Sequence, residues 1–305
     1  MSDTGVLILN KPQGMTSRKA LNYVQRLAKP AKVGHAGTLD PLAVGVLVVC
    51  IGSATRLIEY VQRMPKKYQA TFLLGRTSDT EDVQGKVEIL PDTREPDLEE
   101  LVKAASQLTG RIMQRPPVYS ALKLNGKRAY DLARRGEDVE LKARPIDVYR
   151  FEILRYNYPE VEALIQCGSG GYVRSLGRDM AESLGTGAVM SALTRTAIGD
   201  YRIEEASDPT ELTPENWRER ILPSLGAVAT IPSITLQTEE IARLHCGQFL
   251  EGETVDKITK ELEGREGASP QDEWAAVAPN GQLAAIVQLR PDGKYGAKRN
   301  FPMES

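Results

Sequence analysis

One loop carries the residues that are best suited to chemistry: Gly-His-Ala-Gly-Thr-Leu-Asp-Pro-Leu-Ala, residues 34–43. Its Asp40 is a carboxylate among basic neighbours, and its His35 is one of 2 histidines in the chain. A carboxylate of this kind can attack a carbon atom or take a proton without a cofactor. The flanking glycines permit a turn with positive φ, and Pro41 restricts the backbone directly after Asp40. The alternative is an Asp that only bonds its own turn.

The elements that must hold this loop follow from hydrophobic periodicity. The apolar run of residues 44–51 predicts a buried strand directly after the loop, where a rigid scaffold often carries reacting groups. Residues 5–10 predict a first strand, and Thr16 is a suitable cap for a helix over residues 17–28. Further helices are predicted over residues 54–64, 97–108, 130–134 and 172–184, with strands over residues 66–74, 146–154, 160–167 and 189–196.

The length and composition indicate a globular protein with two domains. At 305 residues the chain is long for a single core. Its content of 41% hydrophobic and 26% charged residues is ordinary for a soluble protein. No apolar run is long enough to span a bilayer, and the N-terminus does not read as a signal peptide, so we expect a cytoplasmic protein without a membrane partner. Short strands and turns begin near residue 231, which predicts domains over residues 1–230 and 231–305, with residues 248–250 a strand and residues 260–272 an irregular loop.

Cysteine usage agrees with a reducing compartment. Cys50, Cys167 and Cys246 are odd in number and far apart, and the first two lie in predicted strands. We therefore expect reduced, buried cysteines in a cytosolic protein. With 2 histidines and no close cysteine pair, a zinc site is not expected, and we predict neither a metal nor a cofactor.

The charge distribution says more than the net charge of −2. Up to residue 77 the chain carries eleven Lys or Arg and three acids, whereas residues 78–100 carry nine acids and two basic residues. One interpretation is chance patterning on solvated faces. The other is a cationic surface for phosphates, with an acidic insertion turned away from it.

The loop of residues 34–43 resembles the central motif of the tRNA pseudouridine synthase B (TruB) family. The resemblance covers about the first 200 residues well and the remainder loosely. The sequence departs from the motif at Ala36 and Val44, where the family often has threonine, and both changes remove a hydroxyl group. Further segments match in family order: Lys11-Pro12, Lys67-Tyr68, Pro116-Pro117-Val118-Tyr119-Ser120-Ala121, Ala143-Arg144-Pro145, Tyr172-Val173-Arg174-Ser175-Leu176 and Leu193-Thr194-Arg195-Thr196.

The resemblance implies a catalytic role for three residues. Asp40 would be the nucleophile, and Arg174 would keep it anionic, since a guanidinium suits a paired carboxylate in a water-poor site. Tyr68 would stack on a base that has been turned out of the RNA. From the residues alone, Arg174 would be a solvated helix residue and Tyr68 a core residue.

Four other residues are candidates for substrate binding. Leu193 would close the pocket opposite Tyr68, and His35 would fill the space that the extruded nucleotide leaves. Lys11 would support the active-site loop or contact a phosphate. Asp79 would order Arg174 or the flipped base.

Taken together, the resemblance implies an α/β (α+β) catalytic domain with a mixed, largely antiparallel sheet and a small C-terminal β-rich domain of the PUA type. It implies a monomeric isomerase that converts the T-loop uridine of tRNA, the one in the TΨC sequence, to pseudouridine. The T-arm would be recognised by loop shape and splayed bases. The alternatives are a non-catalytic RNA-binding or RNA-folding protein and, less favoured, an RNA-guided catalytic subunit of a larger particle.

Overall fold

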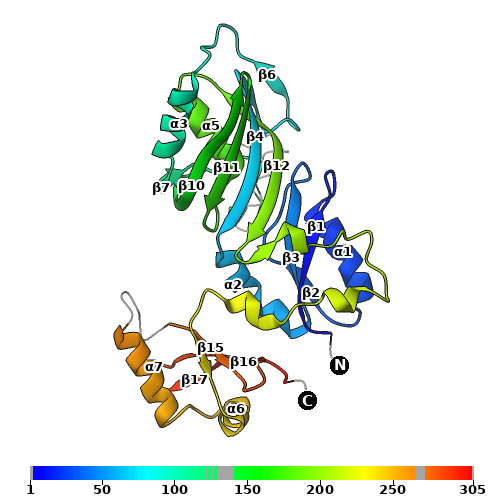
Figure 1. Ribbon diagram of the computed structural model, residues 1–305, viewed down its shortest axis with the longest axis vertical. Coiled ribbons are helices and arrows are strands. Elements are labelled where there is room, and N and C mark those ends of the chain that lie inside the picture. The colour runs from blue at the N-terminus through cyan, green and yellow to red at the C-terminus, as the bar shows by residue number, and fades with distance from the viewer. Residues whose placement is uncertain (1–2, 121–122, 125–126, 129–140, 265–271, 304–305) are drawn as a thin grey trace.

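The computed structural model describes residues 3–120, 123–124, 127–128, 141–264 and 272–303. A nine-stranded sheet forms its centre, with the order β1-β3-β12-β4-β11-β10-β7 along the main path (Figure 1). All neighbours on this path are antiparallel except β3 and β12, which form a short parallel pair. The mixed, largely antiparallel sheet is therefore confirmed. The bounds on the path are β1 Gly5–Lys11, β3 Val44–Ile51, β12 Ala188–Ile198, β4 Lys66–Leu74, β11 Glu160–Cys167, β10 Arg144–Asn157 and β7 Gly110–Gln114.

Shorter strands complete the large domain. β2 (Val33–His35) pairs with β3, and β13 (Tyr201–Arg202) pairs with β12. The acidic segment of residues 78–100 begins in a small hairpin of β5 (Arg76–Ser78) and β6 (Val87–Ile89). A further pair lies at β8 (Lys123–Leu124) and β9 (Lys127–Arg128).

Helices pack on the sheet where the periodicity predicts them. The side chain of Thr16 caps α1 (Ser17–Leu27) by accepting from the backbone N–H of Lys19. Asp97 caps α3 (Leu98–Gln107) in a capping box. The predicted helix over residues 54–64 is instead a 3₁₀ helix, Gly52–Leu57, followed by the short α2, Ile58–Arg63. Three further 3₁₀ helices span Ile203–Glu205, Trp217–Arg220 and Ser224–Val228, and the predicted helix over residues 130–134 lies outside the described residues.

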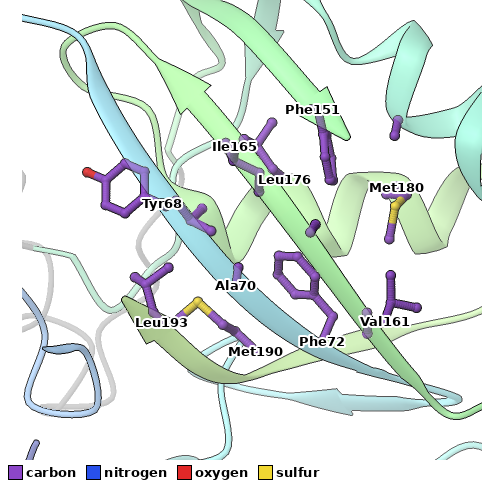
Figure 2. Packing of buried hydrophobic residues seen from close by; sticks show 14 of the residues in the cluster. Tyr68, Ala70, Phe72, Phe151, Val161, Ile165, Leu176, Met180, Met190 and Leu193 are labelled. Carbon is purple, nitrogen blue, oxygen red and sulfur yellow. The ribbon is translucent and has the colours of Figure 1, made fainter. Parts of the chain in front are cut away.

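The core beside the site lies between the sheet and α5 (Val173–Ser183). Tyr68, Phe72 and their alternate neighbours on β4 point into this core (Figure 2), as the alternation of side chains along a strand requires. Gly177 lets α5 approach closely, because an added Cβ would collide with the ring of Phe72. The helix that carries Arg174 is thereby held against the strand that carries Tyr68.

The C-terminal region has a four-stranded sheet, with the order β14-β15-β16-β17. Its bounds are β14 Ser233–Thr235, β15 Trp274–Val277, β16 Leu283–Leu289 and β17 Tyr295–Asn300. Two helices, α6 (Thr238–His245) and α7 (Glu253–Gly264), accompany it. The predicted strand at residues 248–250 is wrong, since only an isolated bridge forms at Phe249. The irregular loop predicted over residues 260–272 is wrong for residues 260–264, which form the end of α7. Residues 265–271 lie outside the described part of the chain.

Two other expectations concern the whole chain. Cys50 and Cys167 are buried free thiols in strands, as expected. Cys246 is an exposed free thiol, so the expected burial is wrong for this residue. None of the helices among the described residues is long and apolar enough to cross a membrane.

Candidate active site

The structure brings Asp40 and Arg174 together. Arg174 Nη2 lies 3.0 Å from Asp40 Oδ2, although the two residues are far apart in the sequence. The side chain of Arg174 is 6% exposed, whereas that of Asp40 is 39% exposed. The carboxylate therefore has a charged partner on the protein side and remains open to an incoming molecule on the other.

Arg174 is fixed by partners other than Asp40. Its Nη1 donates to the carbonyl oxygen of Thr80 at 2.7 Å, and its Nη2 donates to that of Tyr119 at 3.1 Å. A second carboxylate, that of Asp82, lies 3.6 Å from Nη1 and is almost completely buried. Arg174 thus sits between two carboxylates with its planar fork oriented by backbone oxygens.

Asp82, rather than Asp79, is the acidic residue of this loop that reaches Arg174. Asp79 is exposed and accepts a hydrogen bond from the backbone N–H of Lys86. Asp82 accepts from the hydroxyl of Thr80 at 2.6 Å and from the backbone N–H of Gln84 at 3.0 Å. The role proposed for Asp79 in ordering Arg174 is therefore corrected to Asp82. No sequence signal separates the two, because they lie in one run of acids.

Glu81 ties the same loop to α5. Its carboxylate accepts from the hydroxyl of Ser175 at 2.7 Å and pairs with Arg178. Burial raises the pKa of Glu81, and the guanidinium of Arg178 opposes that shift. Glu81 and Asp82, two acids of the predicted acidic insertion, thus turn inward and pair with Arg178 and Arg174.

The loop that carries Asp40 is hydrogen-bonded to the start of α1. Ser17 Oγ donates to the carbonyl oxygen of Leu39 at 3.0 Å and lies 2.8 Å from the backbone N–H of Leu39, from which it accepts. The N–H of Gly14 donates to the carbonyl oxygen of Pro41 at 2.7 Å. Both neighbours of Asp40 are therefore bound to the segment that begins α1. Sequence reasoning missed Ser17, because a serine at the start of a helix can have several roles and the sequence does not tell them apart.

Lys11 supports this segment and is not placed for a phosphate. It is completely buried, and its Nζ donates to the carbonyl oxygens of Met15 at 2.7 Å and Pro12 at 3.0 Å. Burial lowers the pKa of Lys11 to about 8, against the attraction of Asp40. Of the two roles considered for Lys11, loop support agrees with this geometry, and contact with a phosphate is wrong because the side chain does not reach solvent.

Arg195 on β12 is a second buried arginine that sequence reasoning did not single out. Its side chain is buried, and its Nε donates to the carbonyl oxygen of Val46 at 2.7 Å. Its Nη2 donates to the carbonyl oxygen of Gly37 at 3.2 Å, inside the loop that carries Asp40. Gly37 has a φ of +104°, which explains the glycine at this turn. Arg195 therefore connects the loop to the central sheet.

Tyr68 and Leu193 line the apolar side of the site. They come from the adjacent strands β4 and β12, and each is 8% exposed. Both belong to the core cluster that includes Leu39, next to Asp40. Figure 2 shows the Tyr68 ring at the edge of the cluster, with its hydroxyl directed away from the other labelled side chains. Burial raises the pKa of Tyr68, so its hydroxyl is protonated at neutral pH.

His35 lies on β2, before the turn that leads to Asp40, and is half-buried. Burial lowers its pKa, and the nearby charges of Arg195 and Arg18 act in the same direction. The ring is therefore neutral at neutral pH. At the two positions that depart from the family motif, Ala36 packs in the core and Val44 begins β3.

The comparisons with known proteins agree with this geometry. Residues 25–173 match the TruB family pseudouridylate synthase, N-terminal domain. The chain is 38% identical over 292 residues to the tRNA pseudouridine synthase B of Arthrobacter sp. (strain FB24), covering 93% of this chain and 92% of the relative. It is 41% identical over 256 residues to that of Aquifex aeolicus (strain VF5), covering 82% and 86% of the two chains.

Two solved structures resemble the whole chain. One is the structure of an H/ACA RNP bound to a substrate RNA containing 2'-deoxyuridine, with a TM-score of 0.72, 21% identity, and coverage of 99% of this chain and 86% of that one. The other is an archaeal box H/ACA sRNP Nop10-Cbf5 complex, with a TM-score of 0.71, 22% identity, and coverage of 99% and 87%. At these identities the likeness shows the fold.

Proposed function

Because the chain belongs to the TruB family of tRNA pseudouridine synthases, we propose that it isomerises the T-loop uridine of tRNA, the one in the TΨC sequence, with Asp40 as nucleophile. The observation that carries this proposal is the Asp40–Arg174 pair at 3.0 Å, with the carboxylate 39% exposed. The family consists of isomerases that make pseudouridine in tRNA. For this chain, the T-loop target and the roles of the residues are our proposal.

The reaction needs no external reagent. The bond between the sugar and N1 of uridine breaks, the base turns, and a bond forms between the sugar and a carbon of the base. The proton on that carbon leaves, and N1 gains one, so atoms balance. Asp40 forms and then releases a covalent bond to the nucleotide, as carboxylate nucleophiles do in other group transfers. Arg174 stabilises the carboxylate each time it is released.

The uridine must leave the RNA stack to reach Asp40. Extrusion costs a few kcal/mol of unstacking, and stacking on an aromatic ring returns about 1–3 kcal/mol per base. We assign the stacking role to Tyr68 and the opposite wall to Leu193, since the two are neighbours across β4 and β12. We assign the vacated space in the T-arm to His35, whose neutral ring can stack between bases.

The other proposed features concern the whole chain. Residues 1–230 form the catalytic domain and residues 231–305 a PUA-like RNA-binding domain. We propose that the enzyme acts on the T-arm of tRNA as a monomer in the cytoplasm.

The test is the nucleoside profile of an unmodified tRNA transcript after incubation with the protein. We expect one pseudouridine per tRNA, at the T-loop position, and release of tritium from uridine labelled at the carbon that is rejoined. Asp40→Asn should abolish both signals while tRNA binding persists. Tritium release by Asp40→Asn would remove Asp40 from the mechanism. Binding of tRNA without any pseudouridine formation by the wild type would favour a non-catalytic RNA-binding protein.

A further inference from the structure

The outer surface formed by α1 and the turn after it is cationic, and no acidic residue of this segment offsets its charge. Residues 4–39 contain six Lys or Arg and no acidic residue. Lys11 is the buried one. The other five are exposed: Arg18, Lys19, Arg26, Lys29 and Lys32. We call these five residues the α1 basic surface.

No residue of the α1 basic surface has an acidic partner within 4.0 Å among the described residues. Exposed arginines elsewhere do pair, such as Arg155 with Glu160 and Glu162, and Arg218 with Asp3. The guanidinium of Arg26 instead lies 4.8 Å from the centre of the Tyr23 ring. Unpaired cations keep their full attraction for an external anion, because no internal carboxylate has to be displaced.

The surface is also concave. A groove of about 530 Å³ lies on it, and its walls combine three cations with polar and aromatic side chains. A stacked arginine and tyrosine beside amide groups is a common surface for sugar and phosphate contacts. The residues that line the groove are Lys19, Asn22, Tyr23, Gln25, Arg26 and Lys29.

The α1 basic surface is continuous with the candidate active site. The helix begins at Ser17, which is hydrogen-bonded to Leu39 beside Asp40. The charge of Arg18 contributes to lowering the pKa of His35. With 11 residues the helix runs for roughly 16 Å away from that point. An RNA strand that enters the site past His35 therefore meets these cations next.

We propose that the α1 basic surface binds the phosphate backbone of the tRNA strand that leads to the reacting uridine. This inference rests on the proposed function, since it takes tRNA as the substrate. Phosphate contacts of this kind fix the register of an RNA without reading its sequence. The surface accordingly sets how well tRNA binds and leaves the chemical step to Asp40 and its partners.

The test uses the full chain with Lys19→Ala and Arg26→Ala combined. In the Asp40→Asn background, the dissociation constant for tRNA transcript is measured against KCl concentration. Each lost phosphate contact lowers the slope of log K against log salt by about 0.7–0.9, so the double variant should lose about 1.5 from the slope and bind about 10-fold or more weakly. With Asp40 intact, KM should rise while kcat stays within about twofold of the wild type.

The matched control is Lys103→Ala combined with Arg111→Ala. Both residues are exposed, and they lie on α3 and β7, at the opposite edge of the central sheet from β1. We expect wild-type salt slope and KM from this pair. The charge-preserving change Lys19→Arg with Arg26→Lys should restore binding.

If the Lys19 and Arg26 double variant has the same salt slope and KM as the wild type, the proposed role of the α1 basic surface is overturned. The proposed function stays intact in that case, provided that the wild type forms pseudouridine. Equal weakening by both double variants would also overturn it, because binding would then depend on net charge alone. Absence of pseudouridine in the wild-type reaction would instead count against the proposed function.

Discussion

At the scale of single residues, the site is a chain of alternating charges in which each member orients the next. Asp40 faces the open side, Arg174 lies behind it, and Asp82 lies behind Arg174. Two backbone carbonyl oxygens, those of Thr80 and Tyr119, also accept hydrogen bonds from Arg174. A buried arginine with this many acceptors keeps one geometry, and that geometry fixes the carboxylate of Asp40 in the position that the proposed attack requires.

This arrangement predicts that Asp82→Asn reduces catalysis more than binding. The amide keeps the size of the side chain but loses its charge, so Arg174 is drawn toward Asp40 and the angle between them changes. We expect kcat to fall on the order of 100-fold, with tRNA affinity within about threefold, as measured by single-turnover assays and filter binding. Asp79→Asn, three residues earlier on the exposed loop, should behave like the wild type. Equal effects of the two changes would contradict the role of Asp82.

Lys11 predicts a stability that depends on pH. Its pKa is lowered to about 8 in the folded state, from 10.5 when unfolded, so the unfolded chain binds more protons between these values. The contribution of Lys11 to stability is therefore full above pH 10.5 and is lost as the pH falls through about 8. Lys11→Met removes this titration. From pH 7.5 to 9.5, urea unfolding should show the wild type gaining on the order of 1–2 kcal/mol relative to Lys11→Met. A constant difference would mean that Lys11 is not buried as a cation.

Sequence reasoning found the residues that touch substrate in the proposal. Of the residues that hold them, it found Lys11 and missed Ser17, Asp82 and the role of Arg195. Asp40, Arg174, Tyr68 and Leu193 stood in motifs, and the structure brings them to one place. Ser17 and Arg195 act through contacts with distant backbone atoms, and Asp82 acts through the distant side chain of Arg174. No local pattern encodes such contacts, even for Arg195, which also stood in a motif. A serine at a helix start or an acid in an acidic run has the same local pattern whether or not it reaches such a partner.

At the scale of elements, the loop that carries Asp40 depends on the start of α1. Ser17 Oγ satisfies both the N–H and the C=O of Leu39, and this pair of bonds is buried. The position of Asp40 is therefore coupled to the placement of a helix whose first residue, Ser17, precedes it by more than twenty residues in the sequence.

Ser17→Ala should loosen that coupling. It leaves the two backbone groups of Leu39 unpaired, at a cost of about 1–3 kcal/mol in unfolding free energy, and it should lower kcat at saturating tRNA. Thr16→Ala is the matched change, since it removes a hydroxyl from the adjacent residue and costs about 1 kcal/mol through the lost cap. Denaturation and steady-state kinetics of the two variants should give similar stability losses, with kcat reduced in Ser17→Ala only. A reduced kcat in both would show that helix stability, rather than the bond to Leu39, matters.

Periodicity predicted the elements of the large domain well because its strands and helices each bury one clear face. The alternation of β4 and the apolar stripe of α1 are examples. The C-terminal helices were missed for a physical reason. In α7 the apolar residues that pack against the core are Ile258, which is buried, and Val255 and Leu262, which are partly buried. The charged residues between them give the segment the composition of a loop. Tertiary contacts with the small sheet, rather than a strong local pattern, stabilise that helix.

At the scale of the whole molecule, the two regions share a core. The C-terminal sheet buries one face under its own helices, where Trp274 and Val287 lie. Its other face presents Ala275, Ile286 and a following Phe301 to the large domain, in one cluster with residues of β1 and β3. Polar contacts at the same boundary include Arg299 with Glu59 and Arg63 with Glu273. The boundary near residue 230 therefore separates two folding patterns that pack on each other through an apolar surface.

A shared core predicts that both regions unfold in one transition. The chain has 2 tryptophans, both buried: Trp217 packs in the large domain and Trp274 in the C-terminal one. Trp217→Phe leaves fluorescence that reports on the C-terminal region, and Trp274→Phe leaves fluorescence that reports on the large domain. In each variant the fluorescence transition in urea should coincide with the far-ultraviolet circular dichroism of the whole chain, because separating the regions exposes the apolar face that contains Phe301. A Trp274 signal that changes at clearly lower urea than the circular dichroism would show that the C-terminal region unfolds by itself, and that its contacts with the large domain contribute little stability.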